Sequence, residues 1–345
     1  MKLQSIEAAR GVAALMVVAF HAERALSLPQ YVGHMPLGGA TAFMHTGVDF
    51  FFVLSGYIIF AVHRVDIGRP AALGRYAMRR MTRILPPYWA ATAIAVLLAL
   101  PGHGLPSPGS VAGSLLLVPH AQGPILDVAW TLEREALFYL LFAAAVLDRR
   151  LGVTLVAAWM ALSVAGADLG GWAFDEYSAL FAFGIAAAAI PSHVVPCPVL
   201  LALVGTTAFV ALGLAENAGL LTPAGWLPRM AYGSASAGVI VGLVASERTG
   251  LIRAGRMLGV LGAASYAIYL THTLVLGLAA RAAAEAGLLH LMPDGLAMAA
   301  CCGAAVATGL AFHRLVEVRL TALVRRAGRH PIHPPGPAGT LTGQN

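Results

Sequence analysis

Charged side chains are too scarce in this sequence for a water-soluble protein of its length. Only 11% of the 345 residues are Asp, Glu, Lys or Arg, whereas 59% are apolar. An ordinary soluble domain contains roughly 25% charged and 45–50% apolar residues. The mean hydropathy is +0.77. A chain of this composition has to bury most of its surface in lipid, so we predict an all-α, polytopic membrane protein.

Ten segments have the length and apolar character of a membrane-spanning helix, which needs about 20 residues. Pro, Gly or charged residues separate them. The segments cover residues 8–28, 46–63, 84–101, 132–147, 151–168, 177–191, 198–214, 229–246, 257–280 and 294–316. Small residues are concentrated in Gly184–Ala189 and Gly255–Ala264, which favours the close approach of neighbouring helices. We therefore expect about ten transmembrane helices.

The arginines predict the orientation of these helices. If the N-terminus is cytoplasmic and the spans alternate, 18 of the 22 basic residues lie on the cytoplasmic side. This bias follows the positive-inside rule and places the C-terminus in the cytoplasm too. It also explains the net charge of +6 without a nucleic-acid partner. We expect a membrane domain over residues 1–327 and a Pro- and Gly-rich, disordered cytoplasmic tail over residues 328–345.

Ionisable residues inside the first span are candidates for function, since each costs about 2.5–3.5 kcal/mol near the centre of a bilayer. Arg10 and His21 are eleven residues apart, which places both on one face of a helix, separated by roughly 16 Å along its axis. Arg10 is also explained by a positive-inside anchor. His21 is also explained by a packed histidine bonded to a neighbouring helix.

Three further groups of ionisable residues need a partner or a ligand. Asp49 enters an aromatic run and needs a partner from another helix, which can be purely structural. Arg80 and Arg83 lie in the loop after the second span, and on a helix they would share a face that can grip a phosphate or an anionic lipid headgroup. Glu135 falls one turn into the fourth apolar segment. There it suits acid–base chemistry, or it is a carboxylate stabilised by the dipole at the N-terminus of the helix.

Aromatic residues mark two other places. Trp130 is typical of a membrane interface. Tyr266 and Tyr269 have the spacing of packing residues with satisfied hydroxyl groups, whereas His272 stands one residue apart from that stripe. The three cysteines form no CxxC pattern and the histidines lack the spacing of metal ligands, so we predict no metal site.

Taken together, the motifs resemble the membrane-bound acyltransferase-3 family, which O-acetylates bacterial glycans and related acceptors. The resemblance covers nearly the whole chain. The matching segments are Ile6–His21, Gly47–Tyr57 (with Ser55), Arg80–Arg83 with Pro86 and Tyr88, Trp130–Tyr139, and Ser265–His272. The departures are small: Thr131 replaces a usual Ser, and Ala136 replaces a common second acidic residue. The chain resembles a stand-alone transferase without the esterase-like domain that some relatives carry.

This resemblance implies that the chain moves an acyl group from acyl-CoA, commonly acetyl-CoA, to a hydroxyl of a glycan or lipid-linked glycan. It implies His21 as the base, with Glu135 or Asp49 to orient it, and Arg10, Arg80 and Arg83 as ligands of coenzyme A. It also implies that Ser55, Trp130, Tyr266, Tyr269 and His272 belong to the site, in a multi-pass protein of the bacterial inner membrane among its lipids. A proton-coupled transporter or flippase is the alternative, because intramembrane His, Asp and Arg also mark translocation pathways.

Overall fold

A computed structural model describes residues 3–165, 173–223, 225–253 and 255–327 of the chain, and within these ranges every regular element is a helix. The expected tail at residues 328–345 lies outside the described residues. The α-helices are α1 (Gln4–Leu26), α2 (Gly47–His63), α3 (Leu73–His103), α4 (Pro108–Leu116), α5 (Trp130–Leu147), α6 (Arg149–Val164), α7 (Ser178–Ala189), α8 (Pro198–Asn217), α9 (Trp226–Arg248), α10 (Arg256–Ala263), α11 (Ser265–Glu285), α12 (Asp294–Phe312) and α13 (Val318–Ala327). Short 3₁₀ segments are η1 (Ala42–Thr46), η2 (Arg64–Asp66), η3 (Pro70–Ala72), η4 (Asp127–Ala129), η5 (Ser192–Val194) and η6 (Leu288–His290), and η7 (His313–Glu317) is a π-helical turn.

Each of the ten expected spans corresponds to helical residues, and seven segments are long and apolar enough to cross a membrane. These seven contain α1, α2, α3, α8, α9, α11 and the continuous segment Asp294–Arg326. The other three expected spans coincide with α5, α6 and α7. Helix α5 carries three charged residues, and α6 and α7 have only 16 and 12 residues. The protein is thus a multi-pass, all-helical membrane protein, while the count of ten and the sides of the termini stay predictions.

Two boundaries differ from the sequence prediction. Arg80 and Arg83 are not in a loop, because α3 starts at Leu73, ahead of the apolar run, and continues through Pro86 and Pro87. The expected ninth span is broken at Ala264, so that α10 and α11 are separate helices. Neither difference follows from hydropathy alone, since an amphipathic turn can extend an apolar helix and no proline marks the break.

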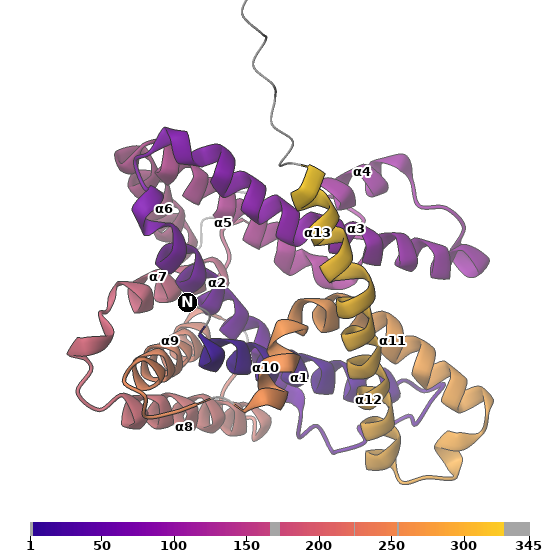
Figure 1. Cartoon of the computed structure of the whole chain (residues 1–345). Coiled ribbons are helices and arrows are strands. Elements are labelled where there is room, and N and C mark those ends of the chain that lie inside the picture. The colour runs from indigo at the N-terminus through magenta and orange to yellow at the C-terminus, as the bar shows by residue number, and fades with distance from the viewer. Residues whose placement is uncertain (1–2, 166–172, 224, 254, 328–345) are drawn as a thin grey trace, which may run out of the picture.

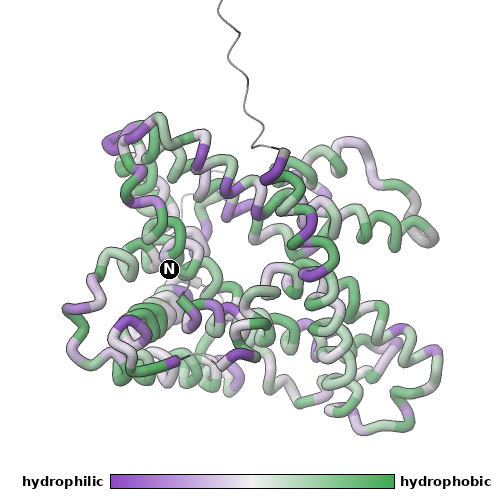
Figure 2. The backbone as a smooth tube through the Cα atoms, viewed as in Figure 1, coloured by the Kyte–Doolittle hydropathy of each residue, from purple (hydrophilic) through white to green (hydrophobic). Residues whose placement is uncertain are grey.

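Helix α1 lies in the middle of the bundle, where it contacts α2, α9, α10, α11 and α12 (Figure 1). Helix α8 packs mainly on α9 and exposes Leu203 and Val204, as expected for a helix surface that faces lipid. Figure 2 shows hydrophobic residues along most of the helices, with hydrophilic stretches that are shorter. The position of α1 is important because both Arg10 and His21 are on it.

Carboxylates hold both ends of α1. At the N-terminus, Glu247 of α9 accepts hydrogen bonds from the backbone N–H groups of Gln4 and Ser5, each at 2.8 Å. These donors have no partner within the helix, so Glu247 acts as an external cap. At the other end, the buried Glu23 accepts hydrogen bonds from the loop that follows; the donors are the N–H groups of Leu37, Gly39 and Thr41 and the Thr41 hydroxyl.

Glycines bring several helix pairs into backbone contact, as the small-residue clusters predict. Gly184 of α7 packs on the α2 backbone near Val53 and Gly56. Gly262 of α10 packs on α1, where an added Cβ would lie 1.7 Å from the carbonyl oxygen of Glu7. Since that neighbour is backbone, it cannot move aside as a flexible side chain would, and α1 and α10 can cross this closely only with glycine at 262.

We expect Gly262→Ala to lower the free energy of unfolding by about 1–3 kcal/mol, because the methyl group forces α1 and α10 apart. Gly259→Ala in the same helix is the matched control, since nothing lies within 4 Å of a Cβ at that position. Thermal unfolding of both purified variants in detergent measures the difference. Equal melting temperatures for the two variants would contradict the close crossing.

Candidate active site

Five helices converge on one pocket that carries most of the predicted site residues. Helix α1 contributes Arg10, α3 contributes Arg80 and Arg83, and α5 contributes Glu135. The remaining lining residues are Val48, Phe51, Phe52, Leu54, Ser55, Ile58 and Ile59 of α2, Ile84 of α3, Thr131, Leu132 and Tyr139 of α5, and Ser265, Tyr266 and Tyr269 of α11. The other lining residues, from Val48 to Tyr269, are 38 to 259 positions from Arg10 in the sequence, and all of them face one space.

The pocket holds more positive than negative charge. Arg10, Arg80 and Arg83 line it together with a single carboxylate, that of Glu135. Among the described residues, Arg10 and Arg83 make no hydrogen bond and no ion pair. Arg80 donates from Nη2 to Nε2 of His63 at 2.7 Å, while its buried Nε has no partner in the described part of the chain. Arg10 and Arg80 are only partly exposed, and a guanidinium group in such a place is costly without a full set of partners, so this pocket is suited to an anionic ligand.

Glu135 is held by two hydroxyl groups. Its Oε1 accepts hydrogen bonds from Ser55 at 2.7 Å and from Tyr139 at 2.5 Å. The Arg80 guanidinium lies 5.9 Å from the centre of the Tyr139 ring. Glu135 and Ser55 come from helices that are distant in sequence, and their contact fixes α5 against α2 at the pocket wall.

The tyrosines of α11 have satisfied hydroxyl groups, as their spacing predicts. Tyr266 donates to the carbonyl oxygen of Ile84 at 3.0 Å. The hydroxyl of Tyr269 lies 2.9 Å from that of Thr131 and 3.2 Å from the carbonyl oxygen of Val128. Both tyrosines line the pocket, and the Tyr269 ring also lies beside His272, with ring centroids 5.7 Å apart.

His21 and His272 lie side by side. Nε2 of the fully buried His272 is 3.3 Å from Nδ1 of His21, and the ring centroids are 4.9 Å apart. Nδ1 of His272 donates to the carbonyl oxygen of Tyr269 at 2.7 Å, and Nδ1 of His21 donates to that of Val17 at 2.9 Å. Because a carbonyl only accepts, both rings carry their proton on Nδ1 when neutral. Nε2 of His21 is then a free base, without a hydrogen bond to any described residue.

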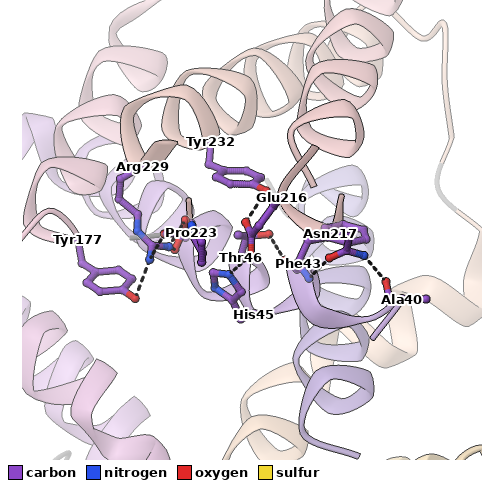
Figure 3. Close-up of polar contacts among 11 residues, drawn as sticks. Ala40, Phe43, His45, Thr46, Tyr177, Glu216, Asn217, Pro223, Arg229 and Tyr232 are labelled. Atoms are coloured by element: carbon purple, nitrogen blue, oxygen red, sulfur yellow. Dashed lines mark hydrogen bonds and ion pairs between the residues drawn. The ribbon is translucent and has the colours of Figure 1, made fainter. Parts of the chain in front are cut away.

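Asp49 has the partner from another helix that its position requires. Nη1 of Arg229 in α9 donates to both Asp49 oxygens, at 2.7 and 2.6 Å, and both side chains are almost fully buried. The Arg229 guanidinium also lies 4.3 Å from the Tyr177 ring centre and donates to its hydroxyl at 3.0 Å (Figure 3). Beside this pair, His45 contacts Glu216 at 2.8 Å.

Neither Asp49 nor Glu135 makes a hydrogen bond with His21, so the described contacts do not support the expectation that one of them orients this ring directly. His272 is in contact with it instead. Trp130 lies outside the pocket lining and packs on Tyr177, with ring centroids 5.2 Å apart. Within the described ranges, no three His, Cys, Asp or Glu side chains are grouped as metal ligands would be.

Three polar residues of this region were not singled out from the sequence. Arg229 follows Pro228 at the start of an apolar segment, where it is easily counted as a loop arginine. His63 and Asp66 end the second apolar run, three residues apart, and that spacing is the only local signal of their contact. Their link to Arg80 spans a loop and is not visible in any short motif.

Comparison with known proteins identifies the family. Residues 3–314 match the family described as "Acyltransferase domain". The chain belongs to the acyltransferase-3 family. It is 30% identical over 280 residues to the "Exopolysaccharide production protein ExoZ" of Rhizobium meliloti (strain 1021). The matched region covers 74% of this chain and 82% of that protein. No solved structure matches the chain significantly.

Membership of this family makes the protein a membrane acyltransferase that transfers groups other than aminoacyl groups. The intramembrane charges left two functional classes open, acyl transfer and transport. Family membership decides in favour of acyl transfer. The helical bundle and the pocket are thus those of an enzyme.

We expect Asp49→Ala to lower the free energy of unfolding by about 3–5 kcal/mol, because it leaves Arg229 buried without its counter-ion. Glu285→Ala is the control, since the Arg281–Glu285 pair is exposed and such pairs contribute little. Chemical or thermal unfolding of the purified variants measures both effects. A melting temperature of Asp49→Ala as high as that of Glu285→Ala would rule out a stabilising role for the Asp49–Arg229 contact.

Proposed function

We propose that this protein transfers an acyl group, commonly acetyl, from acyl-CoA to a hydroxyl group of a polysaccharide or its lipid-linked precursor in the bacterial inner membrane. The family supplies the reaction class. The printed name of the Rhizobium relative, an exopolysaccharide production protein, supports a polysaccharide as the acceptor. The donor and the roles of single residues are argued from the pocket.

The unpaired guanidinium groups of the pocket are the observation that carries the proposal. Coenzyme A is a polyanion with a long uncharged arm that ends in the thioester. Arg10 and Arg83 make no hydrogen bond and no close ion pair among the described residues, and the pocket also holds two buried polar atoms without a hydrogen-bond partner, Nε of Arg80 and Oγ of Ser265. Phosphate oxygens would satisfy the guanidinium groups by charge-assisted hydrogen bonds. Glu135 offsets part of the positive charge and keeps Ser55 and Tyr139 in place.

A short chain of contacts links this pocket to the histidines. Tyr269 lines the pocket, and its carbonyl oxygen accepts the hydrogen bond of His272, which contacts His21. The phosphates would lie near the arginines and the thioester near the histidines, which the eleven-residue interval between Arg10 and His21 on α1 accommodates.

His21 is the catalytic base in this proposal. Its Nε2 takes the proton of the acceptor hydroxyl as the oxygen attacks the thioester carbonyl carbon. The tetrahedral intermediate then collapses, the carbon–sulfur bond breaks, and the imidazolium returns the proton to the leaving thiolate. The products are the acyl ester and free coenzyme A, so that atoms and charge balance.

His272 acts as a positioning residue for His21. Its Nδ1–H is fixed by the Tyr269 carbonyl, and its Nε2 faces the Nδ1–H of His21 as an acceptor. This arrangement keeps the proton of His21 on Nδ1 and its lone pair on Nε2. Asp49, bonded to Arg229, holds α2 against α9 and contributes to the site through that packing.

We expect His21→Ala to lower the rate of acetyl transfer by at least ~100-fold, because it removes the general base. The assay follows release of the coenzyme A thiol from labelled acetyl-CoA in the presence of an exopolysaccharide oligosaccharide. His290→Ala, a change at an exposed histidine, is the control. A folded His21→Ala variant that transfers acetyl at the wild-type rate would exclude His21 as the base.

We expect Arg80→Ala and Arg83→Ala each to raise KM for acetyl-CoA by about tenfold, as for the loss of a charge-assisted contact to phosphate. Arg79→Ala is the matched control, because Arg79 is an exposed neighbour on α3 that does not line the pocket. Acetyl-pantetheine, which lacks the phosphates bound by the arginines, should respond to none of the three changes. An unaltered KM in both pocket variants would refute the assignment.

A further inference from the structure

His63 connects a buried carboxylate to an arginine of the pocket. It is the last residue of α2, is fully buried, and lies outside the pocket lining. Its Nδ1 is 2.8 Å from Oδ2 of Asp66, and its Nε2 is 2.7 Å from Nη2 of Arg80. A guanidinium can only donate a hydrogen bond, so Nε2 of His63 is the acceptor and Nδ1 carries the proton that is donated to Asp66. The ring is thus neutral in this arrangement.

Because His63 is a neutral acceptor, the positive charge of Arg80 stays available to bind an anion. An arginine in an apolar environment usually pairs with a carboxylate, as Arg229 does with Asp49. Such a partner would cancel the charge with which Arg80 can bind an anion. His63 accepts one N–H of Arg80 without cancelling this charge, and Arg80 lines the pocket.

Two aromatic rings and a hydrogen-bonded carboxylate hold the His63 ring in position. Its ring packs edge-on against Tyr76, with centroids 4.9 Å apart, and against Phe142 at 6.5 Å. Asp66 is fixed in turn by Arg75, whose Nη2 donates to Oδ1 at 2.9 Å. Arg80 has no comparable support, since its bond to His63 is its only hydrogen bond among the described residues.

We propose that His63 is a positioning residue for the acyl donor: Asp66 sets its tautomer, and its Nε2 holds the Arg80 guanidinium, with its charge intact, at the place where donor phosphate binds. The inference rests on the proposed function for the identity of the donor. It predicts that the loss of His63 weakens the binding of phosphate-bearing donors and leaves the chemical step largely intact.

The test compares three substitutions at this one position. His63→Ala removes both nitrogen atoms, and His63→Phe removes them but keeps a ring against Tyr76 and Phe142. His63→Gln offers an amide oxygen to Arg80. We expect KM for acetyl-CoA to rise about tenfold in the Ala and Phe variants and to return toward the wild-type value with Gln, whereas kcat changes less than KM. A purely packing role predicts the opposite ranking, with Phe better than Gln.

Two controls make the result specific. With acetyl-pantetheine as donor, none of the His63 variants should differ from the wild type, because the phosphate contacts are absent. His34→Ala breaks another His–Asp contact of 2.8 Å, which lies in an exposed loop far from α3 in sequence, and should leave KM for acetyl-CoA unchanged. Binding of coenzyme A itself, measured by isothermal titration calorimetry, provides a readout that does not depend on turnover.

The outcomes separate this inference from the function on which it rests. If the wild-type protein neither binds coenzyme A nor transfers acetyl from it, the proposed function fails and the inference fails with it. If the wild type does both and folded His63→Ala and His63→Phe bind coenzyme A as tightly as the wild type, only the positioning role of His63 is overturned. If Phe restores binding and Gln does not, His63 acts through packing, and the proposal is wrong.

Discussion

The cost of placing ionisable groups in a medium of low dielectric constant governs this structure. A buried charge is tolerated when a counter-ion, a set of hydrogen bonds or a ligand compensates it. Asp49 and Arg229 illustrate the first solution, and Glu23, which accepts several backbone N–H groups, illustrates the second. The half-buried Arg10 and the exposed Arg83 make no hydrogen bond and no close ion pair among the described residues, and Glu135 and Glu317 act on Arg10 only from a distance. This contrast separates charges that hold the helices together from charges that are available to bind a substrate.

The two kinds of charge also lie in different parts of the helical bundle. The compensated pairs of Asp49 with Arg229 and His45 with Glu216 lie near the starts of α2 and α9 and the end of α8. The uncompensated arginines lie around the pocket between α1 and α3. The pair of His21 and His272 is linked to the pocket by the Tyr269 carbonyl oxygen, which accepts a hydrogen bond from His272. Under the proposed function, a donor bound by its phosphates at the arginines would reach His21 with the far end of its uncharged arm.

Much of this arrangement follows from local patterns in the sequence. Apolar runs predict the helices, and the isolated carboxylate of Asp49 correctly requires a partner from elsewhere. The small residues at Gly184 and Gly262 predict close helix crossings that the structure confirms. The predicted site residues on α1, α3, α5 and α11 line one pocket, apart from His21, His272 and Trp130. These features depend on the spacing of apolar residues, on local composition and on the free-energy cost of burying a charge. All three can be judged from one segment of the sequence.

Pairings between distant segments could not be predicted in this way. The identity of the Asp49 partner depends on how α9 packs on α2, and the link from Asp66 through His63 to Arg80 depends on the turn between α2 and α3. The start of α3 at Leu73 and the break at Ala264 were also missed, because tertiary contacts rather than hydropathy decide them. The same limit explains why His272, and neither candidate carboxylate, is the neighbour of His21.

The way in which α1 is held has a consequence for the range of possible donors. Glu247 fixes its first turn, Gly262 locks it against α10, and Glu23 ties its last turn to the following loop. Arg10 and His21 are on one continuous helix, so the helical rise sets the interval between them, and these contacts at three levels hold that helix in place against its neighbours. Under the proposed function, α1 would set the distance between the bound anion and the thioester, so it would select donors by the length of the arm that joins them and not by the acyl group beyond.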